Sequence, residues 1–415
     1  MVKRNEYLAQ LSAWREKQVI KVVSGVRRCG KSTLLQQYID SLKTSGIENE
    51  QIIQINLEDP KFESLHNYEM LYTYIQKRLC KKKYTYVFID EVQQCINFEE
   101  AIDGLFIKKN VDLYITGSNA NMLSGELATL LSGRFVEINM LPLSFGEYFR
   151  LIGKKAKDSD KRTILNNYLR FGSFPYAALL GSDAGMIKIY IEGIYNTILI
   201  KDVAAQLNTT DVTLLSNIIK FLSHSAGSPI STKKISDTIN SSGRKTSINT
   251  IENYIRCLTD SFIFYHSERY DIKGKQYLKT LGKYYIVDTG IRNMLLETSS
   301  PDLGHQLENI VYLELLRRFR HASVGKLDEN EIDFVTTGGN TPDNDQEGIR
   351  YYQVAATVMD PNTLSRELSG LQKIKDNHPK YLLTLDDIPS RANHNGIIQK
   401  YLVDWLLEKE STTPP

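Results

Sequence analysis

The stretch Val22–Ile39, VVSGVRRCGKSTLLQQYI, contains the pattern that decides the fold of the first part of this chain. Its central residues match G-x-x-x-x-G-K-[ST]; they are Gly25, Val26, Arg27, Arg28, Cys29, Gly30, Lys31 and Ser32. Thr33 follows directly. Glycines let a backbone turn tightly and point successive N–H groups at an anion, while the lysine reaches the outer phosphates and the hydroxyl binds Mg²⁺. We therefore predict that residues 25–33 bind a nucleotide, with Ser32 as a metal ligand.

The residues on either side of this loop have the pattern that the motif requires. Lys17–Ser24 is short, β-branched and largely apolar, which predicts a buried strand. Lys31–Leu42 has apolar residues at helical spacing. The alternative is a chance match in an ordinary turn before a helix, since the pattern fixes only four positions.

A second apolar segment, Tyr86–Ile89, ends in two acids, Asp90 and Glu91. A strand of this kind delivers its last residues beside the phosphate loop, so Asp90 is a predicted Mg²⁺ ligand and Glu91 is predicted to polarise the attacking water. A strand followed by a solvated acidic turn is the alternative, and it would be preferred if the two acids stood alone.

Two further segments supply candidate residues. Leu113–Asn119 is another strand with a polar end, where Asn119 is a catalytic candidate that the sequence does not separate from Thr116 and Ser118. Arg134, in LSGRF, could face the γ-phosphate of a neighbouring subunit and stabilise charge in the transition state. This predicts a homo-oligomer; the alternative for Arg134 is a surface or fold-stabilising arginine.

Taken in order, GVRRCGKST, FIDEVQ, ITGSNANML and LSGRFVEINMLPLSFGEYF resemble the AAA ATPase domain of bacterial and archaeal proteins that carry a nuclease-like domain of unknown function after it. The resemblance covers nearly the whole chain. It implies that Gly25–Thr33 is the Walker A loop, Asp90-Glu91 the Walker B acids, Ser118-Asn119 sensor 1 and Arg134 the arginine finger. It also implies ATP rather than GTP as the nucleotide. Cys29 differs from the residue that relatives often have, and we expect it to be a packing residue.

Length and composition are consistent with several domains. The 415 residues predict about two or three domains. The net charge of +2 gives no overall basic field, and four scattered cysteines with seven histidines form no metal-binding spacing. No apolar run approaches the roughly 18 residues of a membrane helix, and the start of the chain lacks the apolar run of a signal peptide. We expect a reduced, cytoplasmic protein without a membrane partner.

The predicted fold class is α/β. Residues 1–152 alternate strands, including Gln51–Leu57, Thr85–Ile89 and Val111–Thr116, with amphipathic helices, which predicts a parallel sheet in a P-loop AAA domain. A helical region over 163–225, a winged-helix unit over 226–295 and a nuclease-like domain over 304–410 follow.

The winged-helix unit could contact DNA. Its predicted second helix, Ser247–Leu258, and the turn before it offer five residues able to contact bases or phosphates: Arg244, Lys245, Ser247, Asn249 and Asn253. Acidic residues dilute this face, and such units within ATPases also serve as packing or protein-contact modules.

The last region resembles PD-(D/E)xK nucleases, with Glu308 on a helix and Asp333 in a strand. The E-x-K positions, however, read Gln353-Val354-Ala355, and an alanine can neither take a proton nor offer charge. We therefore predict that this nuclease-like domain is inactive. A helix near Gly396–Leu407 is predicted at its end. Its two acids are expected to stabilise the fold with basic residues nearby: Arg317, Arg318 or Lys326.

The sequence thus predicts an AAA ATPase that uses Mg²⁺ and ATP to move the attached winged-helix and nuclease-like domains, with DNA as a further partner. A nucleotide-gated DNA-binding or scaffold protein with little turnover is the alternative, and an ATP-dependent nuclease is the third hypothesis.

Overall fold

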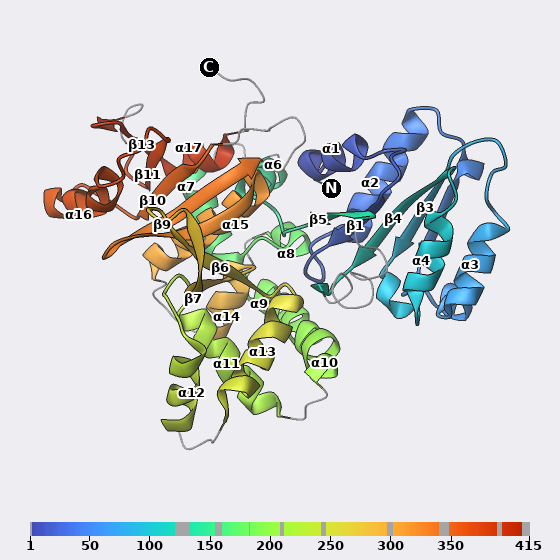
Figure 1. Ribbon diagram of the computed structural model, residues 1–415, viewed down its shortest axis with the longest axis horizontal. Coiled ribbons are helices and arrows are strands. Elements are labelled where there is room, and N and C mark those ends of the chain that lie inside the picture. Colours follow the sequence, from blue (N-terminus) through green and yellow to red (C-terminus); the bar gives the residue numbers. More distant parts are fainter. Residues whose placement is uncertain are drawn as a thin grey trace. The chain divides into compact units, whose positions relative to one another are not determined.

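The computed structural model describes residues 2–120, 133–153, 160–181, 183–207, 211–241, 246–296, 302–339, 348–387 and 392–408 (Figure 1). Two compact units make up the chain. The first comprises Met1–Pro142 with Asp260–Phe262, and the second comprises Leu143–Thr259 with Ile263–Pro415.

The first unit contains a five-stranded parallel sheet with the order β2-β3-β4-β1-β5. Its strands are β1 Ile20–Ser24, β2 Ile52–Asn56, β3 Thr85–Asp90, β4 Val111–Gly117 and β5 Phe135–Asn139. The first four were predicted from their apolar runs, whereas β5, which is only partly buried, was not. Because all five strands run in one direction, their carboxyl ends meet at one edge of the sheet.

Helices cover both faces of this sheet (Figure 1). α1 Asn5–Ala13 and α2 Lys31–Thr44 lie on one face, and α3 Tyr68–Gln76 and α4 Phe98–Phe106 lie on the other. Alternate strand residues such as Val22, Ile89 and Ile115 pack against the buried side chains of α3 and α4 in one core. Among the residues described in this unit, three short 3₁₀ segments connect these elements: η1 Asn49–Gln51, η2 Pro60–Leu65 and η3 Val92–Gln94.

A buried ion pair lies on the face that α2 covers. The Lys21 ammonium on β1 is fully buried and donates to the Asp112 carboxylate on β4. The Tyr114 hydroxyl and the backbone N–H of Glu16 also donate to Asp112, each over 2.9 Å. Since a buried charge is tolerated only with partners of this kind, the network ties β1, the strand that leads into the phosphate loop, to β4.

The second unit begins with helices. They are α6 Phe145–Gly153, α7 Lys161–Phe171, α8 Pro175–Leu179, α9 Ala184–Thr197, α10 Ala205–Leu207, α11 Val212–His224, α12 Thr232–Ser241 and α13 Ile248–Asp260. A π-helical segment, η5 Ile198–Ala204, follows α9, and α14 Thr289–Leu296 comes later in the chain.

The second unit also contains an eight-stranded mixed sheet, with the order β12-β13-β11-β10-β9-β8-β6-β7. Its strands are β6 Phe264–Asp271, β7 Gln276–Ile286, β8 Phe319–Leu327, β9 Asn330–Gly339, β10 Arg350–Ala355, β11 Lys380–Thr384, β12 Asn393–His394 and β13 Ile397–Tyr401. The remaining helices are α15 Leu303–Arg318, α16 Pro361–Gln372 and α17 Leu402–Leu407. β6 pairs in parallel with β8, so strands from the predicted 226–295 and 304–410 regions share one sheet.

The helix predicted near Gly396–Leu407 is wrong in its first half. Ile397–Tyr401 is strand β13 and pairs in parallel with β11, and the helix starts only at Leu402. A short apolar run does not distinguish a strand from a helix, and here the open edge of β11 decides.

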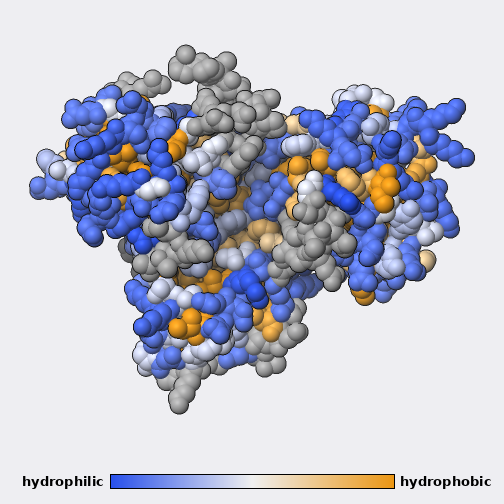
Figure 2. All heavy atoms as spheres, viewed as in Figure 1, coloured by the Kyte–Doolittle hydropathy of each residue, from blue (hydrophilic) through white to orange (hydrophobic). Residues whose placement is uncertain are grey.

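None of the helices among the described residues is both long enough and apolar enough to cross a membrane. Figure 2 shows mainly hydrophilic residues on the visible face of each unit.

Candidate functional site

The loop between β1 and α2 depends on glycine at two positions. Gly25 has φ of 145°, and a Cβ there would lie 2.2 Å from the Met140 carbonyl oxygen, so no other residue fits. Gly30 has φ of 110° and directly precedes the first residue of α2. The loop therefore curls tightly at the amino end of the helix, where N–H groups lack helical partners and attract anions.

Lys31 lies inside this curl. Its ammonium donates to the carbonyl oxygens of Gly25 over 2.9 Å and Val26 over 3.4 Å. It also lies 3.6 Å from Glu91 Oε1, although Lys31 and Glu91 are 60 residues apart in the sequence. The lysine thus makes contact with both the loop and the acidic end of β3.

The other loop residues differ in their surroundings. Cys29 is fully buried, and burial raises the pKa of its thiol. Arg27 Nη1 donates to Glu58 Oε1 over 3.1 Å. Arg28 has a left-handed backbone with φ of 65°, a further sign of how sharply the loop turns.

Asp90 ends β3 and is held by two hydroxyl groups. Thr116 Oγ1 donates to Asp90 Oδ1, and the Ser32 hydroxyl also hydrogen-bonds to this side chain. Burial raises the pKa of the Asp90 carboxyl, and these hydrogen bonds oppose the shift. The two predicted metal ligands, Ser32 and Asp90, therefore lie side by side.

Glu91 follows with a left-handed backbone, φ 53°, and a buried side chain. Its Oε2 accepts hydrogen bonds from Gln93 Nε2 at 2.5 Å and from Ser118 Oγ at 3.2 Å. Burial disfavours the charged carboxylate, but Lys31, Arg27 and these hydrogen bonds outweigh it and lower the pKa of Glu91. Glu91 is therefore ionised near neutral pH.

The polar end of β4 meets these acids. Thr116 contacts Asp90 and accepts the Glu91 backbone N–H over 2.9 Å, and Ser118 contacts the Glu91 side chain. Asn119, the residue chosen as the catalytic candidate, comes next in the chain and is half-buried.

Arg134 lies away from the loop of its own chain. Its carbonyl oxygen accepts the Ile20 N–H over 2.8 Å at the amino ends of β1 and β5, whereas the phosphate loop follows the carboxyl end of β1. Its guanidinium pairs with Asp103 on α4, lies over the Phe106 ring and is 44% exposed. The side chain therefore lies at the edge of the sheet opposite the phosphate loop of its own chain, and its contacts with Asp103 and Phe106 agree with the alternative of a fold-stabilising arginine.

Sequence reasoning missed Arg4, which lies behind the loop. This buried guanidinium donates to the carbonyl oxygens of Cys29 at 3.3 Å, Leu141 at 2.8 Å and Pro142 at 3.4 Å. A signal was present, because Arg4 is spaced from Tyr7, Leu8 and Leu11 as a residue on the same helical face would be.

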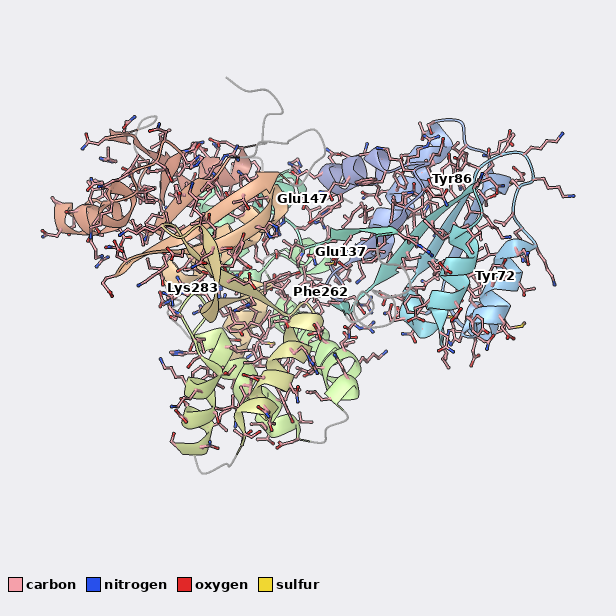
Figure 3. The ribbon with its side chains drawn as sticks, viewed as in Figure 1. Tyr72, Tyr86, Glu137, Glu147, Phe262 and Lys283 are labelled. Atoms are coloured by element: carbon pink, nitrogen blue, oxygen red, sulfur yellow. The ribbon has the colours of Figure 1, made fainter. Side chains whose placement is uncertain are left out.

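The acids of the second unit have a partner that the sequence analysis did not predict. Lys283 on β7 lies 2.8 Å from Glu308 Oε1 and 2.8 Å from Glu331 Oε1, and its position is labelled in Figure 3. The predicted partners were wrong: Arg317 and Arg318 pair with Glu314, and the cation that pairs with Glu308 is Lys283 rather than Lys326.

Asp333 completes this cluster. Its Oδ2 accepts the Val354 N–H over 2.8 Å, and burial together with the nearby Glu308 raises the pKa of its carboxyl well above the ordinary value. Gln353 Nε2 donates to Glu367 Oε2 over 3.0 Å. Within the described ranges no group of three metal-binding side chains occurs, and Lys283 supplies the positive charge among these acids.

Comparison with known proteins places the chain in a family. An uncharacterized protein of Haemophilus influenzae is 39% identical over 412 residues, which are 98% of this chain and 99% of the relative. The chain belongs to the family of that protein. Residues 17–149 match an AAA domain, so the first unit is an AAA-family P-loop domain. Residues 162–302 match a domain of unknown function, DUF8612.

Two further comparisons extend this result. The uncharacterized protein MJ1544 of Methanocaldococcus jannaschii is 29% identical over 340 residues, covering 77% of this chain and 73% of its own. The Walker-type ATPase PABY2304 of Pyrococcus abyssi superposes with a TM-score of 0.50 at 14% identity, covering 71% of this chain and 96% of its own. This structural likeness shows the fold alone. The two family matches end before residue 304, so the nuclease-like domain stays a prediction.

The Lys283 cluster yields a test of stability. Replacing this 3% exposed lysine (Lys283→Met) leaves two carboxylates without their shared cation and should lower the free energy of unfolding by about 3–5 kcal/mol in urea titrations. The control is Lys273→Met, whose lysine also forms an ion pair but is 64% exposed, and it should cost at most about 1 kcal/mol. Equal effects of the two substitutions would contradict a structural role for Lys283.

Proposed function

We propose that the protein hydrolyses ATP with Mg²⁺ at the edge of the first unit's sheet and uses this to drive a conformational change in the second unit. The observation that carries the proposal is the convergence of Lys31, Asp90 and Glu91, which come from two distant segments. The Lys31 ammonium lies 3.6 Å from the Glu91 carboxylate, and Asp90 is hydrogen-bonded to Ser32, the residue after Lys31. A phosphate ligand, a metal ligand and a base are the three groups that nucleotide hydrolysis needs.

The residues fit the nucleotide and its metal. The tight curl between Gly25 and Gly30 leaves the backbone free for close approach of phosphate, and residues 25–33 would bind it. Ser32 and Asp90 offer adjacent oxygen atoms, the ligand type that Mg²⁺ prefers, and would hold the ion. When bound, Mg²⁺ neutralises charge on the phosphates.

Glu91 would act as the general base. It is ionised and buried, and it takes a proton from water as the water oxygen bonds to the γ-phosphorus and the bond from phosphorus to the ADP oxygen breaks. Lys31 would exchange its contacts with the Gly25 and Val26 carbonyl oxygens for phosphate oxygens. Ser118 and Thr116 orient the two acids, and Asn119 is proposed to contact the attacking water or the γ-phosphate.

Two alternatives differ from this proposal in turnover or product. A nucleotide-gated DNA-binding or scaffold protein would bind ATP at the same loop with negligible hydrolysis. An ATP-dependent nuclease would have to cleave DNA at a site formed by Asp333 and Glu308. Their neighbour Lys283 is engaged in two ion pairs.

Phosphate release from ATP tests the site. Lys31→Ala and Glu91→Gln should each reduce the hydrolysis rate at least about a hundredfold, because one removes the phosphate ligand and the other the base. Glu91→Gln should still bind ATP. Lys43→Ala, an exposed lysine on the same helix, is the control and should retain the parental rate. Parental rates in both site variants would rule out this mechanism.

We further propose that Arg134 acts on the nucleotide of a neighbouring copy. Its support is its place at the edge of the sheet opposite its own loop, together with a partly exposed guanidinium held by Asp103. An arginine contributed in trans stabilises the charge that develops on the transferred phosphoryl group.

Mixing two inactive variants tests this arrangement. Lys31→Ala and Arg134→Ala should each lose at least about tenfold in hydrolysis rate. A mixture should recover activity, because an Arg134→Ala copy keeps its loop and its Lys31→Ala neighbour supplies the arginine. A fully active Arg134→Ala protein, or a mixture with no recovery, would contradict the proposal.

DNA contact through α13 is a second candidate function. The helices α12 and α13 are followed by the antiparallel pair β6–β7, the order of a winged helix. Asn249, Asn253 and Arg256 are exposed at spacings that place them on one face of α13, while Ile251, Tyr254 and Ile255 are buried. Arg244 and Lys245 lie outside the described residues. Asparagine and arginine are suited to base and phosphate contact.

Binding of a duplex at increasing salt concentration tests this candidate. We expect the affinity to fall steeply with salt, because counterions are released at each phosphate contact. Arg256→Gln should reduce the slope of log affinity against log salt concentration by about 1, the value for one phosphate contact. Lys220→Gln, an exposed lysine on α11, is the control and should leave the slope unchanged. Absence of binding at low salt would remove DNA as a partner.

A further inference from the structure

The side chain of Gln93 lies against the proposed general base. Its Nε2 donates to Glu91 Oε2 at 2.5 Å and to Ser118 Oγ at 3.3 Å. The reverse orientation of the amide would place its oxygen against the Glu91 carboxylate, where two acceptors repel, so chemistry fixes which end faces Glu91.

The other end of this amide lacks a partner. Gln93 Oε1 is buried, and no described residue donates a hydrogen bond to it. A buried acceptor without a donor costs free energy, and a bound water, a bound ion or a catalytic role is among the explanations for such an atom in a native protein. Because Oε1 and Nε2 belong to one amide, Oε1 lies within about 5 Å of the Glu91 carboxylate.

The backbone is shaped to bring these groups together. Glu91 has φ of 53°, a left-handed conformation that is unfavourable for a residue other than glycine. The turn that it starts continues into η3, so that the side chain two residues later folds back onto Glu91. Gln94, the next residue of η3, shares the residue type and the half-buried exposure of Gln93. Its backbone N–H donates to the Glu91 carbonyl oxygen, whereas Gln93 contacts the Glu91 carboxylate through its side chain.

We propose that Gln93 positions the attacking water: its Nε2 holds Glu91 in place and its Oε1 accepts the hydrogen of the water that Glu91 does not take. A water molecule has two hydrogens, and both need acceptors if its lone pair is to point at the γ-phosphorus. Glutamine orients the attacking water in other nucleotide hydrolases. The inference rests on the proposed ATP hydrolysis and adds a residue to that reaction.

Steady-state kinetics with Mg²⁺ and ATP test the role of Gln93. Gln93→Leu keeps the size of the side chain but removes both contacts, and it should lower kcat about tenfold to a hundredfold. Its KM and the Kd of a slowly hydrolysed ATP analogue should change by less than about threefold, because the residue touches water rather than phosphate. Gln94→Leu is the matched control and should keep kcat within about twofold of the parent.

The outcomes separate this inference from the proposed function. If Lys31→Ala abolishes hydrolysis while Gln93→Leu keeps the parental kcat, the inference fails and the ATPase stands. If hydrolysis does not depend on Lys31, both fail. Equal losses of kcat and analogue binding, or an equal effect of Gln94→Leu, would show a merely structural role and overturn the inference. Should Gln93→Leu not fold, Gln93→Asn keeps an amide with a shorter reach, and it must show the same loss of kcat with retained binding.

Discussion

The buried ion pair between Lys21 and Asp112 fixes the register of β1 on β4, and the site depends on that register. Lys21 lies opposite Tyr114, so the lysine reaches the aspartate two residues away on the same face of the sheet. A slip by one residue would turn Asp112 to the other face and leave a buried ammonium without a partner. In this register Ser24 pairs with Gly117. On the other side of β4, Ile115 pairs with Ile89 of β3, so the loop and the acids reach the same edge.

Lysine is placed among carboxylates in both units, and the distances distinguish two uses. The Lys31 ammonium lies 3.6 Å from Glu91 Oε1 and donates hydrogen bonds to two carbonyl oxygens of the loop. Lys283 makes two ion pairs of 2.8 Å, and the Tyr285 hydroxyl donates to the same Glu308 oxygen over 2.6 Å. The first arrangement is loose enough to be exchanged for a phosphate. The second is closed by its own residues and belongs to the core of the second unit.

The parts of the site that are contiguous in sequence could be predicted, and the parts that depend on distant contacts could not. The loop at residues 25–33 and the pair Asp90-Glu91 each carry their chemistry in a short motif, and parallel strands bring such motifs together without further information. Lys283 was missed because its partners lie on a helix and a strand 25 and 48 residues later. The role of Gln93 in FIDEVQ could not be predicted, since an uncharged side chain next to two acids gives no sign of which way it folds. Four of the five strands of the first unit followed from their apolar runs, whereas β5 was not predicted because it is only partly buried. The strand β13 was predicted as a helix because its pairing with β11 is a tertiary effect.

The contacts behind the phosphate loop have a consequence for how the sequence can diverge. The hydrogen bonds that the Arg4 guanidinium donates to Cys29, Leu141 and Pro142 all end on main-chain carbonyl oxygens, and the close approach at Gly25 is also to a main-chain carbonyl, that of Met140. A change of side chain at positions 29, 141 or 142 therefore leaves these bonds in place. A change at Arg4 or Gly25 does not, because at these positions the side chain, or the lack of one, makes the contact. Relatives that vary at Cys29 can keep the same loop geometry. A relative that keeps both Arg4 and Gly25 is expected to share this geometry, because these two positions make the contacts behind the loop.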